Sequence, residues 1–179
     1  MPEETVKITN ERLGVLIGPK GTTKKRIEQL TKTVLEIDSA ENSVNVRAKD
    51  PQNPMGFYSA LHIVKAIGRG FSPENALALA DSDQVLQIVS IPEFAGGNEN
   101  QIANKKARII GRQGSIRAQL EERTDTKISV YGKTVAIIGQ ADDAALCQKG
   151  VEMILSGARF ESVWRVLERR RSNQTRAEW

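Results

Sequence analysis

Two glycine turns are the residues of this chain whose types and spacing most directly suggest chemistry. Gly18-Pro19-Lys20-Gly21 and Gly111-Arg112-Gln113-Gly114 share the pattern Gly-x-x-Gly, and both glycines carry the same offset, since 111 − 18 and 114 − 21 each give 93. A glycine turn that opens a helix lets a phosphate backbone approach without meeting a Cβ atom, and the free N–H groups of the helix start attract phosphate. The spacing therefore predicts two phosphate-binding turns within a duplicated module.

The residues around the two turns repeat one order of secondary structure, which must hold the turns in place. Alternating apolar residues predict strands, and apolar residues three or four positions apart predict helices. Thr31-Lys32-Thr33 and Thr124-Asp125-Thr126 keep the 93-residue offset beyond the turns, since 124 − 31 = 93. Each copy therefore reads β-α-α-β-β-α, with the glycine turn between its first two helices. The predicted strands are 5–8, 34–38, 43–47, 84–90, 126–130 and 134–138. The predicted helices are 10–17, 55–67, 102–110, 142–155 and 161–171, and two more begin near residues 22 and 115. Asn10 is expected to cap the first helix, and residues 92–100 are expected to form a loop.

The chain divides into two modules joined by a short connector. Residues 1–71 form the first module, 72–83 a helical connector, 84–157 the second module and 158–179 a C-terminal helix and tail. Ser72-Pro73-Glu74 has the composition of a helix start, with a capping hydroxyl, a proline at the first position and an acid in the first turn. The apolar side chains that follow in the connector predict that it packs on a module.

Composition and charge limit the possible functions. Of the 179 residues, 39% are hydrophobic and 27% are charged, which is typical of a folded globular chain. Only 4% are aromatic, which disfavours a nucleic-acid platform built on exposed rings. The net charge is +3 for residues 1–71 (11 basic, 8 acidic), −3 for 72–83 and +4 for 84–179 (15 basic, 11 acidic). Two basic modules favour a polyanionic partner, although ordinary surface charge explains these numbers equally well.

The remaining reactive residues do not form a recognisable catalytic or metal site. Cys147 is the only cysteine, so an intrachain disulfide is impossible and a reducing compartment is favoured. His62 has no partner at metal-ligand spacing, and Asp142-Asp143 suits a helix start better than acid–base catalysis. The N-terminus lacks the order of a signal peptide, and no apolar run is long enough to span a bilayer. We therefore expect a noncatalytic, cytoplasmic protein with no cofactor and no metal.

The second turn lies in Ile109-Ile110-Gly111-Arg112-Gln113-Gly114-Ser115-Ile116, an apolar pair followed by Gly-x-x-Gly and an amphipathic helix. Two copies of this pattern in the order given above resemble type I KH domains, a family of single-stranded RNA binders. The resemblance implies an α+β fold with two tandem KH domains, each a three-stranded antiparallel sheet backed by three helices, and a C-terminal helix. Residues 68–74 and 157–168 closely resemble the archaeal form of a double-KH ribosome-assembly family. This family is called partner-of-Nob or Dim-two and is related to the Krr factors.

The resemblance also implies which residues bind RNA. In the KH family the turn clamps about four nucleotides, and the bases lie in an apolar groove beside it. Pro19 lacks an N–H group and stiffens the first turn, so we expect weaker RNA binding there. Core packing explains the isoleucines equally well, and a solvated helix face explains the lysines equally well. The implied residues are Gly18, Pro19, Lys20, Gly21, Lys24 and Lys25 in the first module, and Lys105, Lys106, Arg108, Ile110, Gly111, Arg112, Gln113, Gly114, Ser115, Ile116, Arg117, Ile128 and Val130 in the second; Ile17, Leu35 and Ile37 would line the first groove.

The family resemblance implies a role in ribosome assembly. Its members bind the 3′ region of small-subunit rRNA and work with the PIN-domain endonuclease that matures that end; other assembly or translation factors are further possible partners. One alternative is a protein-interaction adaptor whose first KH domain binds a protein, which the departure at Pro19 motivates. Another is a KH subunit of an RNA-degrading complex, or a nuclease itself. The absence of a preceding S1-like barrel argues against the former, and the missing acidic metal cluster argues against the latter.

Overall fold

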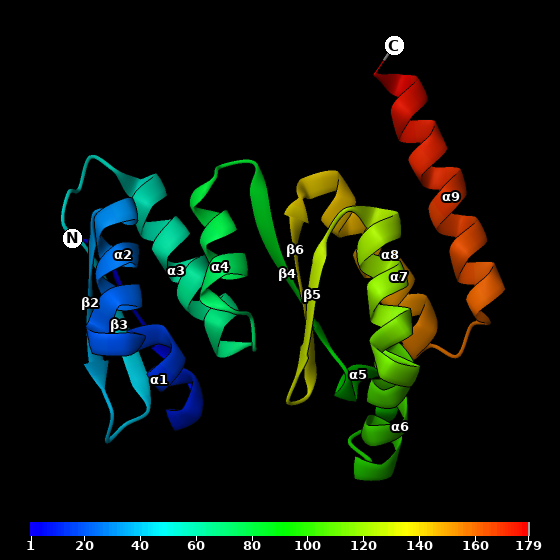
Figure 1. Cartoon of the computed structure of the whole chain (residues 1–179), viewed down its shortest axis with the longest axis horizontal. Helices are drawn as coiled ribbons and strands as arrows, with labels where there is room; N and C mark the ends of the chain where they lie inside the picture. The colour runs from blue at the N-terminus through cyan, green and yellow to red at the C-terminus, as the bar shows by residue number, and fades with distance from the viewer. Residues whose placement is uncertain (179) are drawn as a thin grey trace. The chain divides into compact units, whose positions relative to one another are not determined.

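The computed structural model describes residues 1–178 (Figure 1). Internal contacts divide the chain into two compact units, Met1–Gln84 and Val85–Trp179, called unit 1 and unit 2 below. Each unit contains one three-stranded antiparallel sheet and the helices that pack on it. Among the described residues, no helix is long and apolar enough to cross a membrane.

Unit 1 follows the predicted β-α-α-β-β-α order. Its sheet has the strand order β1-β3-β2, with Val6 opposite Val44 and Leu35 opposite Val46. The last strand along the chain therefore lies in the middle of the sheet, and β2 forms an edge. The elements are β1 (Glu3–Lys7), α1 (Asn10–Ile17), the 3-10 turn η1 (Pro19–Gly21), α2 (Thr22–Thr31), β2 (Thr33–Asp38), β3 (Ser43–Ala48), α3 (Pro54–Gly68), α4 (Pro73–Ala76) and the 3-10 turn η2 (Leu77–Ala80).

Unit 2 repeats this architecture and adds a long helix at its C-terminal end. Its sheet has the strand order β4-β6-β5, with Ile128 opposite Ile137, so β5 forms an edge as β2 does in unit 1. The predicted α+β fold with two sheets and a C-terminal helix is therefore confirmed. The elements are β4 (Gln84–Ser90), α5 (Pro92–Ala95), α6 (Glu99–Ile110), the 3-10 turn η3 (Arg112–Gly114), α7 (Ser115–Thr124), β5 (Lys127–Tyr131), β6 (Thr134–Gln140), α8 (Ala141–Leu155) and α9 (Phe160–Ala177).

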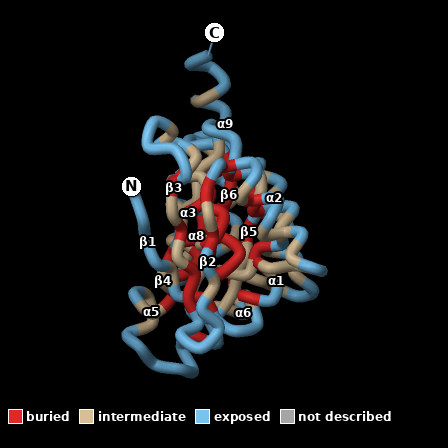
Figure 2. Tube along the Cα trace, turned by 90° about the vertical axis from the view of Figure 1, so that its left-hand side faces the viewer, coloured by how far each residue is buried: buried red, intermediate tan, exposed pale blue. Residues whose placement is uncertain are grey.

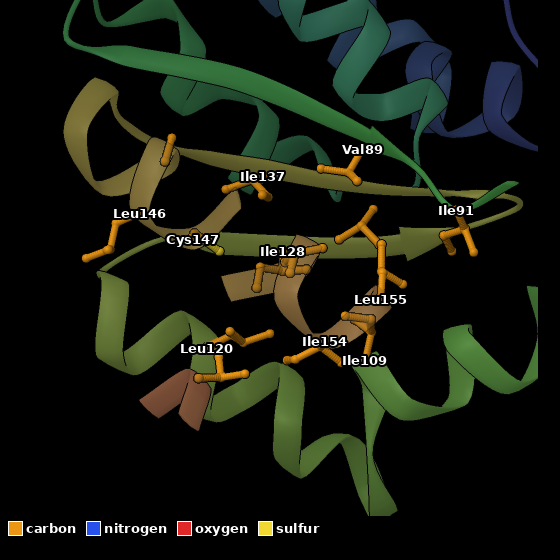
Figure 3. Packing of buried hydrophobic residues seen from close by; sticks show 14 of the residues in the cluster. Val89, Ile91, Ile109, Leu120, Ile128, Ile137, Leu146, Cys147, Ile154 and Leu155 are labelled. Atoms are coloured by element: carbon orange, nitrogen blue, oxygen red, sulfur yellow. The ribbon is translucent and has the colours of Figure 1, made fainter. Parts of the chain in front are cut away.

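Apolar side chains of the sheet and helices form the core of unit 2. Figure 2 shows burial on strands such as β6, whereas the C-terminal end of α9 is exposed. Ile109, Leu120 and Ile137 come from α6, α7 and β6 and gather in one cluster (Figure 3). Val163 and Leu167 of α9 belong to the same cluster and are 0% and 1% exposed. The first half of α9 is therefore part of the core of unit 2.

A pair of threonines closes the second helix of each module, where the sequence repeats. In residues 31–33 and 124–126 the two hydroxyl oxygens lie 2.8 Å apart, and the first threonine donates to the carbonyl four residues before it. The residue between them, Lys32 or Asp125, takes the left-handed conformation with φ of 53° or 51°. This conformation ends the helix and turns the chain into the edge strand.

The connector packs on unit 1. Ser72 caps α4, accepting a hydrogen bond from the backbone N–H of Asn75, as the sequence predicts. Ala76 and Leu79 are buried, and η2 lies against α3. Burial of these small apolar side chains makes the connector a structural part of unit 1.

Three local expectations from the sequence are wrong in detail. Thr9 caps α1, and Asn10 is its first helical residue. The predicted loop over 92–100 contains α5, and Asn98 starts α6 three residues earlier than expected by accepting from two backbone N–H groups. The last helix continues to Ala177 instead of ending near Arg171. None of these differences changes the order of the elements.

Shortening Leu167 tests whether α9 belongs to the core of unit 2. Leu167→Ala should lower the free energy of unfolding by about 2–5 kcal/mol, because it leaves a cavity beside α7 and α8. Tryptophan fluorescence during urea unfolding suits the test, since Trp164 of α9 packs against the core of unit 2. Ile88→Ala is the control: Ile88 is 43% exposed and should cost less than about 1 kcal/mol. Equal losses would contradict the core position of α9.

Cys147 gives a second test, based on pH. The thiol is buried in the core of unit 2, and burial raises the pKa of Cys147, although hydrogen bonds from the two threonines of residues 124–126 oppose the shift. We expect the folded protein to resist an aromatic disulfide reagent at pH 8 and to react once urea unfolds it. Because the folded pKa is raised, stability should fall as the pH rises through the ordinary thiol value of about 8.5. Rapid reaction of the folded protein would contradict the burial.

Candidate nucleic-acid interface

The two glycine turns have the same backbone conformation. Gly18 and Gly111 have φ/ψ of 72°/177° and 73°/178°, a combination that only glycine adopts readily. Lys20 and Gln113 follow in the left-handed region at φ 53° and 55°. The last glycine of each turn is also left-handed, and the next helix starts directly after it. The 93-residue offset in sequence is therefore an offset between two copies of one structure.

The first glycine of each turn is required by packing as well as by backbone angle. A Cβ atom on Gly111 would lie 2.8 Å from the backbone nitrogen of Ile116, and one on Gly18 would lie 2.8 Å from Cβ of Thr23. The last glycine has more room: a Cβ atom on Gly114 would have nothing closer than the guanidinium of Arg117 at 3.6 Å. The first glycine therefore closes the turn, whereas the second leaves an open approach to the helix start.

Both turns present cationic or neutral side chains to solvent. Lys20, Arg112 and Gln113 are exposed, and neither turn contains an acid. α2 and α7 each begin at the turn with no side chain capping their first N–H groups. An uncapped N-terminus of a ten-residue helix carries partial positive charge and unpaired donors. Each turn is therefore an electropositive surface suited to a phosphate group.

A glutamate ties each second helix to its edge strand. Glu28 and Glu121 each accept a hydrogen bond from a backbone N–H of the edge strand and pair with a cation one helical turn earlier. These contacts fix the helix against the strand and hold Lys24 and Arg117 beside the turn. The distances are 2.9 Å from Leu35 N to Glu28, 3.2 Å from Ile128 N to Glu121, 3.6 Å from Lys24 to Glu28 and 3.2 Å from Arg117 to Glu121.

Two further predicted RNA-binding cations, Lys105 and Arg108, contact backbone carbonyls of the protein. Arg108 donates to the carbonyl of Ile154 at 2.8 Å and to that of Ala158, and Lys105 donates to the carbonyl of Leu155. These carbonyls lie at the end of α8, where a helix has acceptors without partners. The structure gives Lys105 and Arg108 a capping role, so their contact with RNA stays a prediction.

Arg12 has the same role in unit 1 and was not identified from the sequence. Its guanidinium donates to the carbonyls of Ile67 at 2.7 Å and Phe71 at 2.6 Å, at the end of α3. The signal was present, because Arg12 and Lys105 are 93 positions apart (105 − 12 = 93). The same offset relates Glu28 to Glu121, which were also missed.

The apolar residues beside the turns divide into core and surface. Ile128 and Leu35 are 4% and 1% exposed and pack in their modules. Ile110, Ile116 and Val130 are half-buried, as are Ile17 and Ile37 of unit 1. The half-buried residues are the ones with surface available to a base. Lys106, Arg117 and Lys24 are also half-buried, whereas Lys25, Pro19 and Ser115 are exposed.

Comparisons with known proteins agree with this arrangement. Residues 85–172 match the family described as eukaryotic type KH-domain (KH-domain type I), and residues 3–53 match the KH domain family. A KH domain-containing protein of Methanocaldococcus jannaschii is 42% identical over 175 residues, which is 97% of this chain and 76% of that protein. The chain belongs to the archaeal double-KH family.

Solved structures of proteins from Aeropyrum pernix and Pyrococcus horikoshii are similar over nearly the whole chain. A protein of unknown function from Aeropyrum pernix has a TM-score of 0.95 and 38% identity, covering 99% of this chain and 94% of that one. Dim2p from Pyrococcus horikoshii has a TM-score of 0.87 and 41% identity, covering 94% and 99%. A complex of a/eIF2alpha, aDim2p and rRNA from the same organism matches with a TM-score of 0.88 and 41% identity, covering 96% and 95%.

An aromatic pair on α9 supports the helices that carry the second KH turn. Phe160 and Trp164 stack with ring centroids 6.2 Å apart. The guanidinium of Arg108 on α6 lies 4.9 Å from the centre of the Phe160 ring, and that of Arg123 on α7 lies 4.7 Å from the Trp164 ring. Cation–π contacts of this kind contribute about 0.5–2 kcal/mol each. α9 therefore contacts both helices that the turn joins.

Alanine at the two glycines of the second KH turn should have unequal effects on stability. Gly111→Ala should lose about 2 kcal/mol or more, because it combines a backbone conformation unfavourable for alanine with a clash against a backbone atom. Gly114→Ala should lose only about 1–2 kcal/mol, the cost of the left-handed conformation alone. Urea unfolding measures both variants. A smaller loss at Gly111 than at Gly114 would show that the turn relaxes to another conformation.

Proposed function

We propose that this protein binds single-stranded small-subunit rRNA near its 3′ end during ribosome assembly, without catalysing a reaction. The observation that carries the proposal is the conformation of the second turn, which combines a glycine-dependent opening, an uncapped helix start and exposed Arg112. The similarity to a chain in the complex of a/eIF2alpha, aDim2p and rRNA supports rRNA as the ligand. The absence of acids from the turn supports contact with phosphate.

Different groups at and beside the turn would contact the phosphates and the bases. Backbone N–H groups at the start of α7 would donate to phosphate oxygens, while Arg112 and Arg117 supply positive charge. Ile110, Ile116 and Val130 would contact the faces of unstacked bases, and polar groups of the edge strand would choose among them. The phosphate contacts position the strand, and the base contacts give selectivity.

Such binding would act through other proteins. A protein that holds a single strand near the rRNA 3′ end can present that strand to an endonuclease or shield it from one. We include a PIN-domain rRNA endonuclease and translation factors among the proposed partners. The presence of a/eIF2alpha in the complex that contains aDim2p supports a partner of the second kind.

A second candidate function for unit 1 is protein binding. Leu30, Met55 and Tyr58 are 54%, 60% and 53% exposed, which is high for large apolar side chains. Leu30 and Met55 border a hollow of about 230 Å³ that is also lined by Ala80 of the connector and by polar residues such as Asn53 and Ser59. An apolar surface of this kind suits a protein partner better than RNA.

A charged side chain at Gly114, the glycine of the second turn with room for one, tests directly whether this turn binds phosphate. Gly114→Asp should reduce affinity for a short single strand from the rRNA 3′ end about tenfold to a hundredfold, because a carboxylate repels the phosphate and competes for the helix donors. Gly114→Asn is the matched control, since asparagine has the same shape and tolerates the same left-handed conformation. Fluorescence anisotropy gives the affinities, and a scrambled strand measures selectivity. Similar affinities for the Asp and Asn variants would contradict the clamp.

The same pair of variants at Gly21 distinguishes the two functions of unit 1. A Cβ atom there has no neighbour within 4 Å, so both variants should fold. A loss of RNA affinity confined to Gly21→Asp supports RNA binding by unit 1. Unchanged RNA affinity in both supports the protein-binding alternative.

A further inference from the structure

The last part of α9 leaves the core of unit 2. Leu167 is the last buried residue of the helix, yet the helix continues to Ala177. Figure 1 shows this end of α9 extending beyond the rest of unit 2, and Figure 2 shows it exposed. We call residues 169–176 the arginine arm. At 1.5 Å per residue it is about 12 Å long.

Every side chain of the arginine arm can donate a hydrogen bond, and none is acidic or apolar. The arm contains four arginines, so its net charge is +4, and the other residues are Ser, Asn, Gln and Thr. Arg165, Arg169 and Arg176 share one face of the helix, since they are separated by four and seven positions. That face lies opposite Val163 and Leu167, which point into the core. The arm therefore presents a cationic surface to solvent.

The charge of the arm is balanced only in part by acids of the described residues. Glu168, directly before the arm, pairs with Arg123 of α7 at 2.8 Å, whereas Arg171 donates to the Arg123 carbonyl and interacts electrostatically with Asp143 of α8. Within residues 1–178, the side chains of Arg169 and Arg170 make no hydrogen bond or ion pair. Like charges four positions apart on a helix destabilise it, as Arg165 and Arg169 do here. A bound polyanion would relieve this repulsion.

Stabilisation of the helix end alone does not explain these arginines. The favourable interaction of cations with a helix C-terminus falls off within the last turn. Arg169 and Arg170 lie about two turns before the end of the helix at Ala177. Their charge therefore requires another explanation than the helix dipole.

We propose that the arginine arm binds phosphate groups of RNA outside the KH clamp, independently of sequence. The inference rests on the proposed function, because it takes the strand to be held at the turn of unit 2. Arg171 fixes the arm to the C-terminal end of α7, whereas the turn lies at the N-terminal end of this ten-residue helix, about 15 Å away. At about 3.4 Å per stacked nucleotide, that distance corresponds to about four nucleotides or more. The arm therefore contacts only strands longer than the clamped segment.

Strand length separates the arm from the clamp in an experiment. A triple variant, Arg169→Gln, Arg170→Gln and Arg176→Gln, is compared with the wild type on single-stranded RNAs of about 6 and about 20 nucleotides, since the clamp holds about four. We expect the variant to lose about tenfold or more in affinity for the long strand at low salt. The slope of log affinity against log salt concentration should become less negative by about 2, because three lost phosphate contacts contribute about 0.7 each. Affinity for the short strand should stay within about twofold.

Two controls make the test specific. The triple variant Lys133→Gln, Lys149→Gln and Arg159→Gln removes the same charge from three exposed positions elsewhere in unit 2 and should leave long-strand affinity nearly unchanged. Replacing the three arm arginines with lysine keeps the charge and should keep most of the affinity. Circular dichroism shows whether the arm variants retain their helix content.

The results separate phosphate binding by the arginine arm from RNA binding at the turn of unit 2, on which the inference rests. A loss on the long strand alone, confined to the arm variant, supports the arginine arm. Equal losses in the arm and control variants, or no loss in either, overturn it while leaving the clamp in place. A wild type that binds the long strand but not the short one contradicts the clamp and supports the arm. A wild type that binds neither strand overturns both.

Discussion

The absence of a side chain at one position of each turn is the constraint on which the rest of the site depends. At Gly111 a Cβ atom would lie 2.8 Å from the backbone nitrogen of Ile116, so the turn between α6 and α7 can be this close only with glycine. This turn leaves the start of α7 uncapped and pointing at solvent. In the proposed function, the cations, the half-buried isoleucines and the edge strand would bind RNA together because the turn places them around the same helix start.

A set of small polar contacts repeats with the turn and keeps its helices in position. The glutamate of the second helix holds the edge strand, the threonine pair ends that helix, and a cation of the first helix caps the last helix of the module. The glutamate and threonine contacts recur 93 positions later on both partners, whereas the cap recurs at that offset only on its donor side, from Arg12 to Lys105. The cap joins residues 55 positions apart in unit 1 and 50 apart in unit 2, so this contact also fixes the tertiary fold. The duplication has therefore retained the supports of the turn together with the turn itself.

The order of elements could be predicted from the sequence because apolar periodicity and glycine positions are local signals. The capping role of Arg108 could not, since its acceptor carbonyls lie 46 and 50 positions away and only the folded chain brings them near. A charged helix face looks the same in sequence whether it faces solvent or a helix end. The end of α9 was also missed, because residues after Arg171 have no apolar periodicity to mark a helix. The equivalence of Arg12 and Lys105 could be predicted from the 93-residue offset, but their capping role could not, because their acceptor carbonyls lie 55 and 50 positions away.

The place of α9 in the core has a consequence for the order in which the protein forms during synthesis. Unit 1 has all its strands and helices within Met1–Gln84, so it can fold while the ribosome is still translating the second half. Unit 2 needs Val163 and Leu167 to fill its core, and both are made after the three strands of its sheet. The nascent chain therefore carries a finished first module and an incomplete second one until α9 has been made. The RNA binding proposed for the second module would then reach full affinity only after α9 has packed.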